Sequence, residues 1–151
     1  MSLIVTRGDP RHPDATDLLE QSQALMRRLF PPEDNFFLDI DALCGGDIRF
    51  FVAEEEGRIL GVGALALREG YGEVKSMFTH EAARGRGIAA MLLSEIEREA
   101  RREGYTLLRL ETGNTLEAAH RVYAKAGFVL RGAFGDYPEA PSSLFMEKRL
   151  S

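Results

Sequence analysis

Hydrophobic residues follow two different spacings along this chain, and the changes of spacing outline the secondary structure. In residues 14–30 and 88–103 the apolar side chains recur every three or four positions, as they do on one face of a helix. Residues 48–55 and 58–67 are instead short apolar runs that meet at Glu56-Gly57, which is typical of a β-hairpin. The pattern therefore predicts a chain that mixes helices and strands.

The remaining apolar runs predict further strands and one further helix. The helix is expected at residues 114–128, where Asn114 and Glu117 stand in capping-box positions, and residues 33–47 are expected to form a short helix or an ordered loop. The further strands are expected at residues 3–8, 71–79, 105–112, 128–134 and 143–150. A helix connects strands 71–79 and 105–112, so these two should be parallel, whereas strands joined by tight turns should be antiparallel. An α/β fold with a mixed sheet and helices on both faces follows.

Composition excludes several classes of protein. The 151 residues predict one domain spanning 1–151, and the 19 basic and 24 acidic residues give a net charge of −5, which argues against non-specific binding to nucleic acid. Cys44 is the only cysteine, and the histidines are scattered without metal-ligand spacing, so no disulfide and no metal are expected. The first residues lack the apolar core of a signal peptide, and no apolar run is long enough to cross a bilayer. We therefore expect a cytoplasmic protein without a membrane partner.

A Gly-rich, Arg-rich junction lies between the strand expected at 71–79 and the helix that begins near Ile88. Its sequence, Arg84-Gly85-Arg86-Gly87, allows free backbone N–H groups of a first helical turn to surround an anion such as pyrophosphate. It lacks the Gly-Lys-Ser/Thr of a P-loop and the glycine fingerprint of dinucleotide-binding folds. Taken alone, such a junction is more typical of a solvated helix start.

Two segments together resemble the signatures of the GNAT N-acetyltransferase superfamily. "RGRGIA" matches the acyl-CoA signature (Arg or Gln, two variable residues, Gly, one variable residue, Gly or Ala) at Arg84, Gly87 and Ala89. Residues 114–128 resemble the second signature, and the predicted order of strands is also that of the family, so the resemblance covers essentially the whole chain. The matching residues of the second signature are Asn114, Ala118, Ala119, Tyr123, Lys125, Gly127 and Phe128.

The resemblance implies a fold and an activity. The fold would be a mostly antiparallel sheet of about six or seven strands with about four helices, in which a splayed parallel strand pair holds acyl-CoA. The activity would be transfer of the acetyl group of acetyl-CoA to a primary amine of a small molecule or peptide, by direct attack through a tetrahedral intermediate. A longer acyl group, or a non-catalytic CoA-binding or regulatory domain, are the alternatives, and a homodimer is compatible with such a small enzyme.

The resemblance also implies which residues bind the cofactor. Backbone groups of Met77, Phe78 and Thr79 would hydrogen-bond the pantetheine amides. Asn114 would contact the cofactor, although a role as helix N-cap would explain it equally well. The pyrophosphate would be held by the junction that comprises Arg84, Gly85, Arg86, Gly87, Ile88 and Ala89.

Two residues are candidates for proton transfer. Tyr123, at the tyrosine position of the family, would protonate the departing thiolate, although its helix face also suits a packed core aromatic. Glu73 would be the base, directly or through a water, and the alternative is an exposed strand carboxylate paired with Lys75. Strict alternation places Glu73, Lys75 and Met77 on one side of their strand.

The acceptor pocket would be built from residues 31–43 and 134–143. Phe37 and Tyr137, with Phe36, are the candidates for packing the substrate, and four carboxylates would attract an ammonium group: Glu33, Asp34, Asp39 and Asp41. The alternative is a solvated acidic loop with core phenylalanines.

Overall fold

The computed structural model of the protein describes residues 2–150, which form seven strands, four α-helices and two short 3₁₀ turns. The helices are α1 (Pro13–Leu29), α2 (Ile40–Leu43), α3 (Ile88–Arg102) and α4 (Glu117–Lys125), and the 3₁₀ turns are η1 (Pro32–Asp34) and η2 (Glu81–Ala83). The strands are β1 (Leu3–Arg7), β2 (Ile48–Glu55), β3 (Arg58–Leu67), β4 (Gly72–Thr79), β5 (Leu107–Gly113), β6 (Val129–Arg131) and β7 (Ser143–Arg149).

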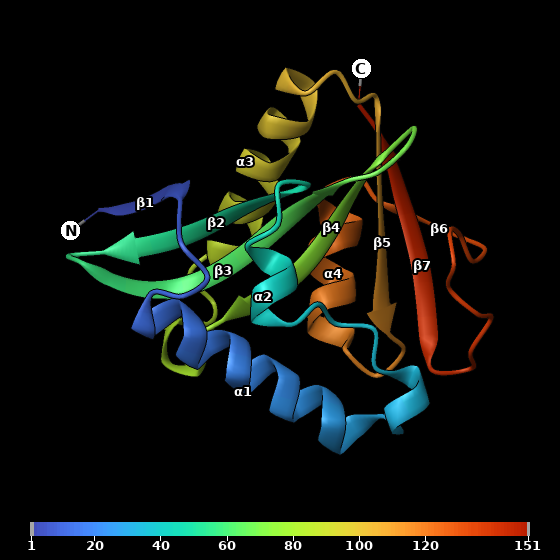
Figure 1. The fold of residues 1–151 in the computed structure, drawn as a ribbon, viewed down its shortest axis with the longest axis horizontal. Helices are drawn as coiled ribbons and strands as arrows, with labels where there is room; N and C mark the ends of the chain where they lie inside the picture. The colour runs from blue at the N-terminus through green and yellow to red at the C-terminus, as the bar shows by residue number, and fades with distance from the viewer. Residues whose placement is uncertain (1, 151) are drawn as a thin grey trace.

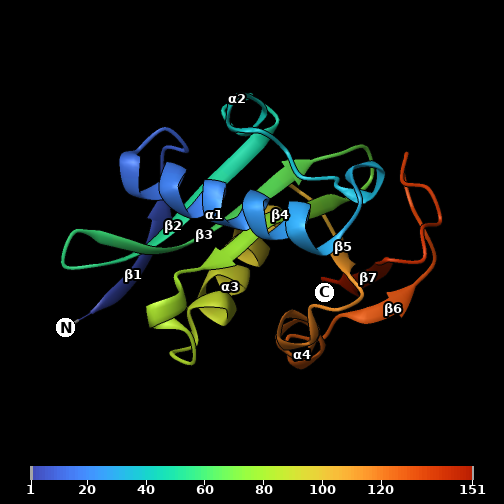
Figure 2. The same cartoon turned by 90° about the horizontal axis from the view of Figure 1, so that it is seen from below.

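The strands form one sheet in the order β1-β2-β3-β4-β5-β7-β6, and every neighbouring pair is antiparallel except β4 and β5. The parallel pair follows from the α3 crossover between its two strands. Helices α1 and α2 cover one face of the sheet, and α3 and α4 cover the other (Figures 1 and 2). The α/β fold expected from the spacing of apolar residues is therefore confirmed.

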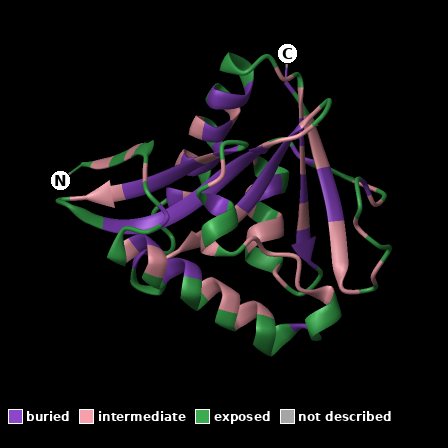
Figure 3. Cartoon of the chain, viewed as in Figure 1, coloured by how far each residue is buried: buried purple, intermediate pink, exposed green. Residues whose placement is uncertain are grey.

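Each face of the sheet has its own hydrophobic core. On the α3 face, the core includes Leu92, Ile96 and Leu110, and on the α1 face it includes Leu18 and Val62. Figure 3 shows the buried residues concentrated along the central strands and the inward faces of the helices. Gly61 makes close packing of α3 possible, because a Cβ there would lie 2.6 Å from Ile88 Cγ2.

A β-bulge interrupts β4 in the middle. The pairing of β3 with β4 shifts register between Val62 and Ala64, and Ser76 adopts a left-handed φ of 57°. The extra residue reverses the alternation, so Met77 packs against the α3 core while Phe78 packs against the α1 core. The expectation that Met77 shares a side of the strand with Glu73 and Lys75 is therefore wrong, because strict alternation does not survive a bulge.

The bulge also marks the point where β4 leaves β5. The two strands pair only at Gly72 with Leu108 and at Glu73 with Arg109. They then diverge toward their C-terminal ends, with α4 behind the gap and α1 in front of it (Figures 1 and 2). This opens the middle of the sheet between its two cores.

Several element boundaries differ from those that the sequence predicts. Helix α4 begins at Glu117 with Leu116 as its N-cap, so Asn114 and Glu117 do not form a capping box. Instead Asn114 Nδ2 donates to the Pro141 carbonyl at 3.1 Å. The strand expected at 128–134 covers only Val129–Arg131, and the chain turns later, at Gly135, whose φ is 58°. Residues 33–47 contain both an ordered loop and the short helix α2.

Candidate functional site

A cavity of about 1150 Å³ lies where β4, α3 and α4 meet. It is lined from β4 by Met77, Phe78 and Thr79 and from α4 by Tyr123. The lining from the junction before α3 and from its first turn consists of Arg84, Gly85, Gly87, Ile88 and Ala89. The structure thus brings together, around one space, most of the residues that the sequence suggested for cofactor binding.

The N-terminus of α3 is open toward an anion. Gly87 is its N-cap with a φ of 79° and makes no side-chain cap, and Gly85 has a φ of 84°. Within residues 2–150, no hydrogen bond engages the backbone N–H groups of residues 85–90. A Cβ added to either glycine would meet no atom within 4 Å, so both face open space. Free donors, the helix dipole and the open glycines suit a pyrophosphate.

Arg84 and Arg86 differ in their surroundings. The Arg84 side chain lies over the Phe78 ring at 5.6 Å and lines the cavity. Arg86 instead makes a bidentate ion pair with Glu55, with nitrogen–oxygen distances of 3.1 and 2.6 Å, and does not line the cavity. Asn114, an exposed residue, is also outside the cavity lining. The side chains of Arg86 and Asn114 therefore have structural partners instead of a place at the cavity.

A second cavity, of about 130 Å³, occupies the gap between β4 and β5 on the side of α1. Met77 and Tyr123 line both cavities, so the two spaces meet at these side chains. Phe37 is part of its wall, as is Lys75. A small space that adjoins a large one is the arrangement needed for a reaction between a small acceptor and a long cofactor.

Tyr123 stands at the junction of the two spaces. Its side chain is buried and packs edge-to-face against Phe128, with ring centroids 5.9 Å apart. Burial raises the pKa of its hydroxyl, so the group keeps its proton at neutral pH. Its hydroxyl makes no hydrogen bond to another described residue. Tyr123 is thus both a core aromatic and an available proton donor.

Glu111 is a carboxylate of the small cavity that the sequence did not single out. It lies on β5, lines the cavity and accepts a hydrogen bond from Ser143 Oγ at 2.7 Å. Burial is the main cause that raises the pKa of Glu111 above its ordinary value. Alternation along β5 could have indicated it, since Leu108 and Leu110 face the α3 core and Glu111 must face the other way.

Glu73 lies in a buried network next to the small cavity, outside its lining. The residue is 2% exposed, and its carboxylate is bound by Arg68 Nε at 3.1 Å, by the Tyr137 hydroxyl at 2.5 Å and by Lys75 Nζ at 3.6 Å. The pairing with Lys75 is confirmed, but the alternative of an exposed strand carboxylate is wrong. The fold buries this edge of β4 under the loop that carries Tyr137.

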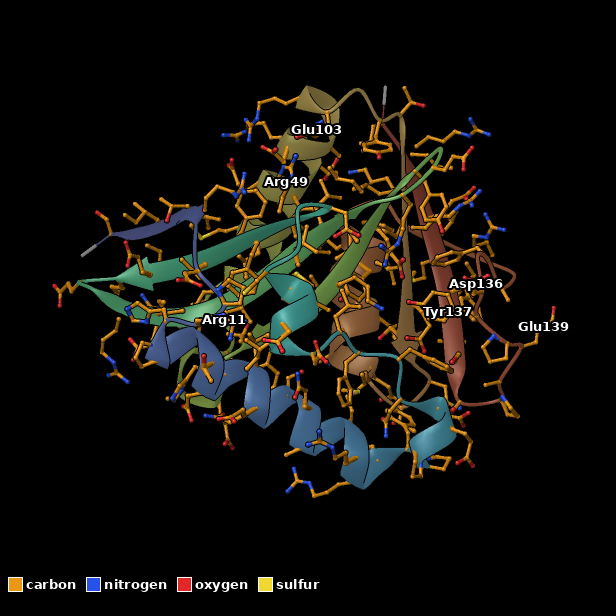
Figure 4. All side chains as sticks on the ribbon, viewed as in Figure 1. Arg11, Arg49, Glu103, Asp136, Tyr137 and Glu139 are labelled. Carbon is orange, nitrogen blue, oxygen red and sulfur yellow. The ribbon has the colours of Figure 1, made fainter. Side chains whose placement is uncertain are left out.

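Tyr137 and Lys75 connect that network to the cavity. The Lys75 ammonium donates to the Tyr137 hydroxyl at 2.6 Å and to the Phe36 carbonyl at 3.0 Å, and burial lowers the pKa of Lys75. The Tyr137 ring is 5.3 Å from Phe36 and 5.6 Å from Phe145. Figure 4 labels Tyr137 beside β7. Tyr137 thus supports the wall of the small cavity from behind and does not line it.

The acidic residues expected at the acceptor pocket have separate roles. Only Asp34 lines the small cavity, and it accepts a hydrogen bond from Ser142 Oγ at 2.7 Å. Asp39 caps α2 by accepting from the Ala42 N–H at 2.8 Å, and Asp41 pairs with Arg11 on the surface (Arg11 is labelled in Figure 4). Most of these charges are therefore explained by local structure.

Comparison with known proteins identifies the family. The sequence profile of the acetyltransferase (GNAT) family matches residues 16–128 of the chain. The chain belongs to the acetyltransferase (GNAT) family. The protein is accordingly an acetyl-CoA-dependent N-acetyltransferase in fold and activity, and the free N–H groups at the α3 N-terminus fit the pyrophosphate of its cofactor.

Individual relatives agree with this assignment. The chain is 42% identical to an IAA acetyltransferase of Azospirillum brasilense over 151 residues, which cover 99% of each protein. A Klebsiella pneumoniae structure described as an acyl-CoA N-acyltransferase superposes with a TM-score of 0.83 at 30% identity, covering 99% of this chain and 98% of that one. The fold is shared with a Thermoplasma acidophilum N-acetyltransferase in complex with coenzyme A, with a TM-score of 0.76, 17% identity and 99% of both chains covered. Acetyl transfer is thereby favoured over a longer acyl group or a non-catalytic domain.

Two further observations concern the part of the acetyltransferase that the structure describes. Between residues 2 and 150, no helix is both long and apolar enough to cross a membrane. The same residues contain no group of three or more His, Cys, Asp or Glu side chains placed to hold a metal ion.

Proposed function

We propose that this acetyltransferase modifies the primary amine of a compact small molecule, or of the first residue of a peptide, inside the 130 Å³ cavity. The observation that carries the proposal is that this cavity holds a carboxylate, Glu111, and meets the cofactor cavity at Tyr123. Cavities of about 150 Å³ hold a ligand of the size of benzene. The cavity thus suits an amine with a short or ring-sized body.

The cofactor would be held by the backbone more than by side chains. Acetyl-CoA supplies the acetyl group as a thioester. The free N–H groups before and within the first turn of α3 would bind its pyrophosphate, and Arg84 would add positive charge. Strand β4 beyond the bulge, at Met77, Phe78 and Thr79, would offer backbone hydrogen bonds to the pantetheine arm, because it no longer pairs with β5 there.

Glu111 would take the proton of the amine. An alkyl amine with a pKa of about 10.4 is protonated at pH 7, and freeing it costs roughly 4.6 kcal/mol, so a base at the acceptor site is needed. The raised pKa of Glu111 makes it a stronger base than an ordinary carboxylate. Tyr123 would give its hydroxyl proton to the departing sulfur, since its raised pKa keeps it protonated, and the second proton that the nitrogen loses after attack would then restore the Tyr123 hydroxyl.

Glu73 would act by positioning. Its carboxylate holds Tyr137 and Lys75, which in turn hold the cavity wall at Phe36. We therefore assign direct proton transfer to Glu111 and the orientation of the wall to Glu73.

The pH dependence of turnover tests this assignment. The experiment measures thiol release from acetyl-CoA with a set of small primary amines, together with the IAA named for a similar protein. The kcat/KM of the native enzyme should fall as the pH drops through the Glu111 pKa, which lies above the ordinary value of 4.5, because the base becomes protonated. Glu111→Gln should lower kcat/KM by about 10² or more and remove this acidic limb.

Glu73→Gln is the matched control, and it should keep the acidic limb although its rate falls. An unchanged limb in Glu111→Gln, or its loss in Glu73→Gln alone, would reassign the base to Glu73. Tyr123→Phe should lower kcat by at least about tenfold with little change in the acetyl-CoA KM. Full turnover in that variant would show that solvent protonates the sulfur.

We also propose a cytoplasmic location and a homodimer. The single cysteine is compatible with a reducing compartment. The edge strand β6 leaves Val129 and Leu130 exposed at 62% and 67%, and such a strand can pair with a second copy. Cell fractionation tests the location. Sedimentation of the native protein and of Leu130→Glu tests the dimer, and a monomeric native protein would refute it.

A further inference from the structure

Two cations of α4 face the 1150 Å³ cavity without a partner of their own. Arg121 and Lys125 stand four residues apart on the helix, and both are exposed and line this cavity. Within residues 2–150, neither side chain makes an ion pair or a hydrogen bond. Like charges at this spacing repel each other on a helix, so the arrangement costs stability unless an anion binds beside it.

The cations of α3 show how an exposed basic side chain is usually paired. Arg98 and Arg102 each make an ion pair with Glu95 at 3.3 Å. Arg121 has a similar partner within reach along its own helix, because Glu117 precedes it by four residues, a favourable spacing for an ion pair. Among the described residues that pair is not formed, so the guanidinium of Arg121 stays available to the cavity.

The wall of the cavity carries an excess of positive charge. Glu97 lines it from α3, but Lys148 Nζ neutralises this carboxylate at 2.8 Å. Glu117, in the first turn of α4, is the other carboxylate of the lining, and Arg84 adds a cation to the two of α4. The cavity therefore suits an anion, although the whole chain has a net charge of −5.

We propose that Arg121, with Lys125 beside it, binds the ribose 3′-phosphate of coenzyme A. This inference rests on the placement of the cofactor in the proposed function. A phosphate monoester such as this one has a charge of about −1.5 to −2 at pH 7, more than either phosphate of the pyrophosphate. A guanidinium binds such a group through two parallel hydrogen bonds.

The two anionic groups of coenzyme A would then have separate sites. The pyrophosphate would lie at the free N–H groups of α3, which need no charged side chain to bind it. A single ribose joins the 3′-phosphate to the pyrophosphate, so both groups must be bound within one cavity. Arg121 lines the same cavity from α4, on a different element from those N–H groups.

Calorimetric titration of CoA and of dephospho-CoA, which lacks only the 3′-phosphate, tests the inference. The native enzyme should bind CoA about tenfold more tightly, the effect of one hydrogen bond between charged groups. Arg121→Gln should reduce this preference to about twofold or less, whereas Arg121→Lys, which keeps the charge, should retain most of it. Because both ligands are titrated into the same protein, a general loss of active protein does not alter the ratio of the two Kd values.

Arg98→Gln is the matched control. It removes the same charge from an exposed helix position, but Arg98 does not line the cavity, so the preference for CoA should stay native. An equal loss of preference in Arg98→Gln would reflect net charge alone and would overturn the inference. So would equal Kd values of the native enzyme for the two ligands. If Arg121→Gln weakens both ligands by the same factor, Arg121 serves the pyrophosphate and the inference fails.

Gly87→Ala separates the inference from the proposed function, and neither titration requires an acceptor amine. If Gly87→Ala weakens both ligands alike while Arg121→Gln keeps the native preference, α3 binds the pyrophosphate and the inference fails. If Arg121→Gln removes the preference while Gly87→Ala leaves both affinities native, the inference holds and the proposed site of the pyrophosphate is wrong.

Discussion

At the scale of single residues, the 130 Å³ cavity is lined by polar groups that do not stabilise the fold. Glu111 is a partly buried carboxylate with a raised pKa. Tyr123 is a buried residue whose hydroxyl, at the junction of the two cavities, makes no hydrogen bond to another described residue. Such side chains reduce stability and are retained where a ligand uses them.

Because burial disfavours the charged form of Glu111, we expect Glu111→Gln to raise the free energy of unfolding in a pH-dependent way. A carboxyl whose folded pKa is raised contributes stability at low pH and loses it as the pH rises through the folded pKa. The neutral glutamine can still accept from Ser143, so the variant should match the native protein near pH 4 and exceed it near pH 8. Urea unfolding at both pH values measures the difference.

The control for this effect is Glu139→Gln, which alters a loop carboxylate without a hydrogen bond or ion pair to another described residue (Glu139 is labelled in Figure 4). Its stability relative to the native protein should not depend on pH. A Glu111→Gln variant that is less stable at pH 8 would show that the charge itself is needed in the fold.

At the scale of elements, two features shape the space around the cavities: the bulge in β4 and the N-terminus of α3, which has no side-chain cap. The bulge at Ser76 turns β4 away from β5, and the divergence creates space that helices cover from both faces. The start of α3 leaves its N–H groups free because Gly87 offers no capping side chain. The surface around the cavity is therefore formed by the path of β4 and the start of α3. Of these features, only the glycine conformation before α3 is set by neighbouring residues alone.

Replacement of Gly87 by alanine tests the role of the α3 start. The variant should lose about 1–2 kcal/mol of stability, since φ is 79° there, and should bind CoA about tenfold more weakly because the N–H groups are misaligned. Gly57, in the β2–β3 turn with a φ of 81° and equally open space, is the matched control. Gly57→Ala should lose similar stability, with CoA affinity unchanged in calorimetry. Equal CoA affinities in the two variants would show that the start of α3 does not bind the pyrophosphate.

At the scale of the whole molecule, the 1150 Å³ cavity lies between two halves of one sheet. Strands β1 to β4 with α3 form one half, and β5 to β7 with α4 form the other, and the halves pair directly at only two positions of β4 and β5. A ligand that contacts α3, β4 and α4 together would join the halves.

We therefore expect bound coenzyme A to raise the free energy of unfolding of the protein, because it would hold the two halves of the sheet together. At a CoA concentration of 100 times Kd, the gain is about 2.7 kcal/mol, which corresponds to a rise in Tm of about 5–10 °C for a protein of this size. Adenosine diphosphate at the same concentration is the control, because it carries a pyrophosphate but is too short to span the cavity. Differential scanning calorimetry measures both, and an equal rise with both ligands would contradict a joining role for the pantetheine arm.

The sequence by itself determined the features that depend on local chemistry. Neighbouring residues are enough to predict the hairpin at Glu56-Gly57, the apolar face of α3 and the glycine turn at Gly85 and Gly87. Turns, helix faces and left-handed backbone depend only on short-range spacing. The family signatures lie on the same elements, which is why the fold and the cofactor could be predicted from them.

Only the tertiary structure decided which side chains meet at the 130 Å³ cavity. Asn35 and Glu111 lie far apart in the sequence, and Glu73, the more obvious carboxylate, is covered by a loop that carries Tyr137. The bulge at Ser76 reverses the sides of β4 on which later residues point. These outcomes depend on long-range packing of strands, loops and α1 around one gap, for which the spacing of neighbouring residues carries no information.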